Sequence, residues 1–185
     1  NLLNSFRKIL RFFMSILILH GWGSSSQSWV KVKELLESQG FEVFAPDLPG
    51  FGEEPPPSSA WGLDDYVEWV KAYADQHELD RFFLVGHSFG GQLATKFTLK
   101  YSHMIKGVIL VAAARVTPRK RWKITVFRVL TKIGNIIFSS PPLHFLRNGA
   151  RRIVYFLAQE RDYYKTEGVM RKVIKNALDE DLTPI

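Results

Sequence analysis

The 185-residue sequence contains no cysteine. Disulfide bonds and thiolate metal sites are therefore excluded, and the composition is compatible with a reducing compartment. The chain also lacks the run of about 18 apolar residues that a membrane-spanning helix needs. The apolar stretch 12–19 is followed by residues 20–23 (HGWG), not by the small-residue cleavage site of a signal peptide. We predict a cytoplasmic protein with no targeting segment, no metal and no cofactor.

Acidic residues are scarce in one part of the chain. Between Arg115 and Lys175, 15 lysines and arginines accompany only three acidic residues, whereas the rest of the chain has more acid than base. The formal net charge of +7 therefore comes from this segment. The asymmetry indicates a mildly acidic body and a cationic insert. With 46% hydrophobic residues, the chain can bury one sizeable core.

The clearest local signal is the stretch 82–91, which reads FFLVGHSFGG. An apolar run typical of a buried strand ends at Gly86, and a helical pattern begins just after Ser88. Ser88 must then occupy a sharp, strained turn, with Gly86 and Gly90 standing where a Cβ would collide as the helix folds back over the strand. The same turn directs the Phe89 N–H to the place where a carbonyl oxygen would become an oxyanion. The pattern predicts a nucleophile elbow, with an ordinary loop as the alternative.

Apolar stretches of strand length alternate with helical patterns along the first 114 residues. Strands are expected at 15–19, 41–45, 82–86 and 107–112, and helices at 29–38, 63–78 and 89–101. This alternation predicts an α/β protein with a parallel sheet and helices on both faces. The loops 20–26 and 46–52 follow strands, which is where open α/β sheets keep their sites. For Asp47, a structural role is favoured over a catalytic one.

Helical patterns replace this alternation from residue 115 onward. They cover 122–138, 143–158 and 163–178, and Pro141-Pro142 separates the first two. We predict a helical cap over the functional edge of the sheet. Residues 1–13 form an amphipathic basic stripe with three open interpretations: a helix packed on the body, an interfacial anchor, or residues that precede a natural start at Met14.

Three motifs agree in order, spacing and type: 20–23 (HGWG), 47–52 (DLPGFG) and 86–91 (GHSFGG). Together they resemble the α/β-hydrolase superfamily, in its capped branch, over about residues 15–185. The resemblance implies that the four strands are the third to sixth of the family's eight, in the order 4-3-5-6. Taken with the patterns described above, it predicts a division into a basic helix (1–13), the N-terminal part of the core (14–114), a helical cap (115–180) and the start of the remaining core (181–185).

The resemblance implies a role for each matching position. Ser88 would be the nucleophile that attacks an acyl carbon, and the backbone N–H groups of Trp22 and Phe89 would form the oxyanion hole. The residues expected to support these turns are His20, Gly21, Gly86, His87 and Gly90.

In this superfamily the triad acid and histidine follow the serine, on loops after two further strands. Those strands are not in the sequence, and the only histidines after Ser88 are His103 and His144. We therefore expect the acid and histidine after Ile185, and the 185 residues to be a nearly inactive N-terminal fragment, because losing triad members costs about 10⁴ to 10⁶ in rate. The strand edge at 108–112 would then be exposed and prone to aggregate.

The leading functional hypothesis is a serine hydrolase that cleaves a carboxylic ester or related acyl bond of a small molecule through an acyl-enzyme. Acyl transfer, perhydrolysis and hydrolytic carbon–carbon cleavage would use the same serine, and a non-catalytic binding protein of this fold is the alternative. The cationic cap allows contact with an anionic membrane surface, the alternative being a solvated cover over the pocket. No nucleic-acid-binding motif accompanies the charge, so no nucleic-acid partner is expected. The sequence does not predict an oligomeric state.

Overall fold

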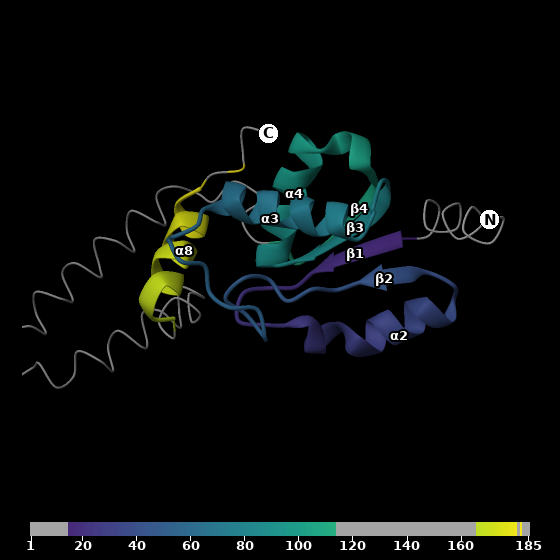
Figure 1. Cartoon of the computed structure of the whole chain (residues 1–185), viewed down its shortest axis with the longest axis horizontal. Coiled ribbons are helices and arrows are strands. Elements are labelled where there is room, and N and C mark those ends of the chain that lie inside the picture. Colours follow the sequence, from purple (N-terminus) through teal and green to yellow (C-terminus); the bar gives the residue numbers. More distant parts are fainter. Residues whose placement is uncertain (1–14, 114–165, 181, 183–185) are drawn as a thin grey trace, which may run out of the picture.

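The chain forms an α/β structure in which strands alternate with helices (Figure 1). The computed structural model describes residues 15–113, 166–180 and 182. The strands are β1 (Ser15–Leu19), β2 (Glu42–Phe44), β3 (Phe82–His87) and β4 (Ile105–Val111). The helices are α2 (Val30–Ser38), α3 (Leu63–Gln76), α4 (Phe89–Lys100) and α8 (Gly168–Asp179), with the short 3₁₀ turns η1 (Ser26–Trp29) and η2 (Ser102–Met104).

The four strands form one parallel sheet in the order β2-β1-β3-β4. This order is the 4-3-5-6 arrangement expected from the sequence. β1 is buried along its whole length, because β2 and β3 flank it and helices cover both faces of the sheet. The predicted parallel sheet with helices on both faces is confirmed.

Side chains of the central strands alternate between two hydrophobic cores. Leu17 and Leu84 belong to the larger core, on the face covered by α3 and α4. Ile16 and Ile18 belong to the smaller one, against α2 on the opposite face. The apolar runs in the sequence are continuous because both faces of these strands are buried.

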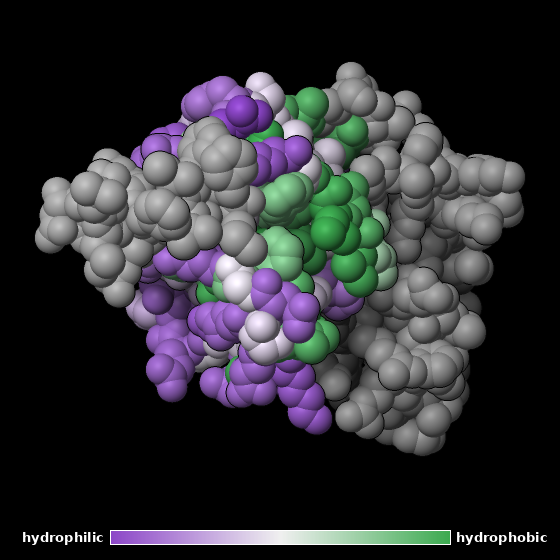
Figure 2. All heavy atoms as spheres, turned by 90° about the vertical axis from the view of Figure 1, so that its right-hand side faces the viewer, coloured by the Kyte–Doolittle hydropathy of each residue, from purple (hydrophilic) through white to green (hydrophobic). Residues whose placement is uncertain are grey.

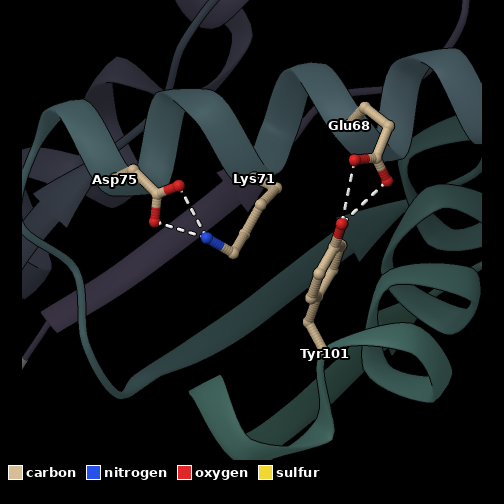
Figure 3. Close-up of polar contacts among 4 residues, drawn as sticks. All are labelled: Glu68, Lys71, Asp75 and Tyr101. Carbon is tan, nitrogen blue, oxygen red and sulfur yellow. Dashed lines mark hydrogen bonds and ion pairs between the residues drawn. The ribbon is translucent and has the colours of Figure 1, made fainter.

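An exposed polar cluster links the middle of α3 to the end of α4 (Figure 3). The Tyr101 hydroxyl donates to both carboxylate oxygens of Glu68, at 2.8 and 2.9 Å, and Lys100 Nζ lies 2.7 Å from the same carboxylate. The hydrogen bonds from Lys100 and Tyr101 lower the pKa of Glu68. Within α3, Lys71 pairs with Asp75 one turn away. Exposed pairs of this kind add little stability.

Helix α8 packs on the body although it comes from the far end of the sequence. Val173 and Ala177 are buried in the larger core, as is Leu182 just beyond the helix. Lys96 of α4 forms ion pairs with Glu180, after α8, and with Asp64 at the start of α3. The last segment of the chain that the structure describes is thereby fixed to both α3 and α4.

Several sequence-based expectations fall outside the described residues. They are the basic helix 1–13, the helices at 122–138 and 143–158, and the domain boundary between 114 and 115. Within residues 15–112 every expected element is present, with ends that differ by at most two residues. Helix α8 corresponds to the third helix expected in the cap, and it also contributes to the core of the body.

Large apolar side chains are exposed at the end of edge strand β4. The exposed fractions are 56% for Ile109, 42% for Leu110 and 41% for Val111. On the face seen in Figure 2, hydrophobic residues gather into a patch with hydrophilic residues to its left and below it. The structure therefore has apolar side chains at the edge that the sequence predicted to be prone to aggregate.

A lysine at the exposed edge should reduce self-association. We expect Ile109→Lys to lower the light scattering of the 185-residue chain at fixed concentration, because a charge on an edge strand opposes pairing with another chain. Leu99→Lys is the matched control, since Leu99 is 50% exposed but lies on α4. Equal scattering from the two variants would count against the edge as the cause.

Candidate active site

Ser88 has an unusual backbone conformation at the junction of β3 and α4. Its φ is 51° and its ψ is −110°, a combination that costs of order 1–3 kcal/mol for a residue with a side chain. Its N–H donates to the carbonyl of Val111 at the end of β4, and its carbonyl accepts the Gly91 N–H, both at 3.0 Å. The turn that carries Ser88 is thus held from the neighbouring strand and from the first turn of the helix.

Glycines around Ser88 allow the helix to lie directly against the sheet. A Cβ on Gly86 would collide with the carbonyl oxygen of Gly90 and would lie 2.8 Å from Ala94 Cβ. A Cβ on Gly90 would collide with the carbonyl oxygen of Leu19 at the end of β1. The sequence led us to expect a collision at both positions, but at Gly90 the obstructing atom belongs to β1 and not to the strand that leads to Ser88. The close approach also lets the Gly90 N–H donate to the His20 carbonyl at 3.1 Å.

His20 joins the two loops that follow β1 and β2. Its buried ring accepts the Leu48 N–H at Nε2, at 2.9 Å, so the neutral ring carries its proton on Nδ1 and donates to the Gly21 carbonyl, at 2.8 Å. Burial lowers the pKa of His20 and favours this neutral form. His20 therefore shapes the turn 20–26, and both of its ring nitrogens are occupied.

Asp47 makes the second link between these loops. One carboxylate oxygen accepts the Ser26 N–H at 2.6 Å and the other accepts the Glu53 N–H at 2.9 Å. Burial alone would raise the pKa of Asp47, but these hydrogen bonds outweigh it and lower the pKa. A Cβ on Gly52 would collide with the carboxylate, which accounts for a glycine there. The contacts support the structural role that the sequence favours for Asp47.

The His87 ring lies against the turn that precedes Trp22. Its Nδ1 is 2.8 Å from the position that a Gly21 Cβ would occupy, and the ring makes an edge contact with Trp29. Among the described residues, no hydrogen bond joins His87 to Ser88. His103, the one histidine after the serine among the described residues, is exposed in η2 beyond the end of α4. The described residues thus place no histidine as a base for Ser88.

The side chains of the two residues predicted to supply oxyanion donors contact each other. The indole ring of Trp22 makes edge contacts with Phe51, at a centroid distance of 4.9 Å, and with Phe89, at 5.3 Å. Phe89 is the first residue of α4, so its N–H has no acceptor within the helix and lies at the positive end of the helix dipole. In the described part of the chain, neither the Trp22 nor the Phe89 N–H donates to a backbone carbonyl.

Helix α8 and Thr166, which precedes it, make contacts that were not predicted from the sequence. Thr166 Oγ1 accepts the Trp22 indole N–H at 3.2 Å, and the Met170 side chain occupies the space that a Cβ on Gly50 would need. These partners are separated by more than 100 residues and follow no periodic pattern. No signal in a single sequence would have found them.

Neither a metal site nor a membrane span is found in the part of the chain that the structure describes. No group of three or more histidine and acidic residues there could hold a metal ion. No described helix combines the length and the apolar character needed to cross a bilayer.

Comparison with known proteins decides the family. The family model described as alpha/beta hydrolase fold matches residues 15–165, which is more than half of the chain. The chain belongs to the α/β-hydrolase fold family. The resemblance inferred from the three motifs is therefore confirmed, as is the assignment of the sheet to part of this core.

Individual relatives of this α/β hydrolase carry different names. It is 31% identical over 105 residues to a 2-hydroxy-6-oxo-2,4-heptadienoate hydrolase from Pseudomonas putida, covering 55% of this chain and 38% of that protein. It is 32% identical over 131 residues to a 1-acylglycerol-3-phosphate O-acyltransferase from Arabidopsis thaliana, covering 64% and 30%. A solved monoacylglycerol lipase from Paleococcus ferrophilus superposes with a TM-score of 0.51 and 27% identity, covering 64% and 47%. The matches span less than half the length of these relatives.

A methyl group at Gly90 should disrupt the junction of β3 and α4. We expect Gly90→Ala to lower the free energy of unfolding by about 3 kcal/mol or more, because the carbonyl of Leu19 must move to admit the Cβ. Gly62→Ala is the control, since the nearest atom to its added Cβ is 3.8 Å away, and we expect a change within about 1 kcal/mol. Urea unfolding measures both. Similar losses at the two positions would contradict the close packing of α4 on β1.

Acid should destabilise the protein through His20. Below the ordinary histidine pKa of 6.5 the unfolded chain takes up a proton that the folded chain resists, so stability falls as pH drops from 7.5 to 5. His20→Gln should lose about 1–3 kcal/mol at pH 7.5, because buried hydrogen bonds are impaired, but should show a shallower decline with acid. Urea unfolding across this pH range, with His103→Gln as an exposed control, measures the slopes. An unchanged slope in His20→Gln would refute the linkage.

Proposed function

We propose that this α/β hydrolase is a serine hydrolase that cleaves a carboxylic ester or related acyl bond of a small molecule through an acyl-enzyme on Ser88. The observation that supports this most strongly is the positive φ of Ser88, which occurs where the strand, the helix and two loops meet. Strain of this kind persists only where the surrounding structure imposes it, and it clusters at functional sites.

In the proposed mechanism, Ser88 Oγ attacks the acyl carbon while a base removes its proton. The carbonyl oxygen becomes an oxyanion that accepts hydrogen bonds from the N–H groups of Trp22 and Phe89. The protonated base then donates to the leaving alcohol, and water attacks the acyl-enzyme to regenerate Ser88. His20 is excluded as this base, because the Gly21 carbonyl and the Leu48 N–H engage its two nitrogens. We place the base and its acid partner after Ile185.

The ring cluster beside the donors favours an apolar acyl group. Trp22, Phe51 and Phe89 contact one another, and Trp22 is only half-buried. Such a wall would contact the acyl chain, whereas the oxyanion donors would bind its carbonyl oxygen. The names of two relatives, a monoacylglycerol lipase and a 1-acylglycerol-3-phosphate O-acyltransferase, are consistent with an acyl substrate. Acyl transfer is the second candidate, because an alcohol that replaces water would use the same acyl-enzyme.

Turnover of p-nitrophenyl esters by the protein as encoded in full tests the proposal. We expect Ser88→Ala to lower kcat by about 10⁴-fold or more, since the acyl-enzyme cannot form without the hydroxyl. Ser102→Ala, at an exposed serine beyond α4, should keep the kcat of the unmodified protein. Ester turnover that survives in purified Ser88→Ala would contradict the proposed nucleophile. Adding a long-chain alcohol separates the two reactions, because only a transferase forms a new ester.

A further inference from the structure

The segment 166–180, here called the α8 segment, contacts two loops of the candidate site and the residues just before α3. Thr166 bonds to Trp22 in the loop after β1, and Met170 lies against Gly50 in the loop after β2. Asn176 Nδ2 lies 3.3 and 3.2 Å from the carbonyl oxygens of Ala60 and Trp61, before α3. The α8 segment therefore joins loops that are separated from it by more than 100 residues.

The α8 segment is itself anchored to the rest of the described structure. Val173 and Ala177 are nearly fully buried in the larger core, and Glu180 pairs with Lys96 of α4. Thr166 lies two residues before the first residue of α8. Its hydroxyl is therefore held by a helix that is itself anchored to the body.

The peptide that carries the Trp22 N–H is held at its other end, because the Gly21 carbonyl accepts hydrogen bonds from His20 Nδ1 at 2.8 Å and from the Ser24 N–H at 3.2 Å. Trp22 lies between Gly21 and Gly23, and Gly23 has a φ of +67° with open space where a Cβ would be. Glycine on both sides gives the Trp22 peptide more freedom than any other residue would. The indole is held as well, through edge contacts with Phe51 and Phe89 and through the hydroxyl of Thr166 at its N–H.

We propose that Thr166 is a positioning residue for the oxyanion hole. By accepting the indole N–H of Trp22, it holds the ring, and the ring acts together with the two hydrogen bonds to the Gly21 carbonyl to hold the peptide whose N–H binds the acyl oxygen. The inference rests on the proposed function, because it assigns a task to the Trp22 N–H that exists only if Ser88 forms an acyl-enzyme. Misplacing a catalytic group by about 1 Å can cost about 100-fold in rate, so a partial loosening should be measurable.

Three variants of the protein as encoded in full test the hydrogen bond through p-nitrophenyl ester turnover. Thr166→Val keeps the shape and removes the acceptor, and we expect kcat to fall about tenfold while KM changes less than about twofold, because the lost stabilisation acts on the oxyanion of the transition state. Thr166→Ser restores the hydroxyl and should recover most of kcat. Trp22→Phe keeps an aromatic ring without the N–H and should show the same loss as Thr166→Val.

A double variant and a matched control separate positioning from folding. Trp22→Phe combined with Thr166→Val should be no slower than either single variant, because both remove one hydrogen bond. Thr98→Val removes a hydroxyl that bonds only within α4, to the Ala94 carbonyl, and should leave kcat unchanged. Melting temperatures of all variants are measured in parallel. If Thr166→Val fails to fold, Trp22→Phe tests the same bond from the other partner.

The outcomes distinguish the positioning role of Thr166 from the serine hydrolase function on which that role rests. Ser88-dependent turnover that Thr166→Val leaves intact, or a loss that Thr166→Ser does not recover, would overturn the positioning role and leave the serine hydrolase standing. A lower melting temperature with unchanged kcat would overturn it equally, since the hydroxyl would then serve folding alone. If the unmodified protein shows no Ser88-dependent turnover, both proposals fail.

Discussion

The strained backbone of Ser88 is the constraint on which the rest of the structure depends. A positive φ at a residue with a side chain lasts only if its neighbours leave no alternative. Here the end of β4 holds the Ser88 N–H, and α4 is pressed against the end of β1 so closely that Gly90 cannot carry a Cβ. The parallel sheet, with β3 at its centre, supplies both neighbours at once. The conformation of Ser88 therefore depends on the order of the strands in the sheet.

The loops at the same edge of the sheet depend on one another through polar contacts, of which those of His20 are buried. His20 binds its own turn with one ring nitrogen and the next loop with the other, and Asp47 binds two further backbone N–H groups. Such contacts replace the hydrogen bonds that loop backbone would otherwise lack. The α8 segment then closes on these loops from the far end of the sequence. Residues that form separate short motifs in the sequence are therefore joined in space by one network of contacts.

Much of this fold could be predicted from the sequence, because its signals are local. The apolar runs of β1 and β3, the glycines at 86 and 90 and the motif order led to the correct sheet order and family. The predictions did not extend to contacts between distant segments. Nothing near Thr166 in the sequence indicates that its hydroxyl meets Trp22, and the core packing of α8 was hidden within a segment predicted to be a cap. Periodicity reports which face of a helix is apolar, but not which partner covers it.

The central claim is that Ser88 is a nucleophile poised beside two oxyanion donors, and covalent labelling tests it most directly. The protein as encoded in full is treated with a fluorophosphonate, which phosphonylates activated serines, and is digested for peptide mapping by mass spectrometry. The account predicts one adduct, on the peptide that carries Ser88, and faster labelling there than at any other serine. No adduct, or an adduct at another serine with Ser88 unmodified, would contradict it.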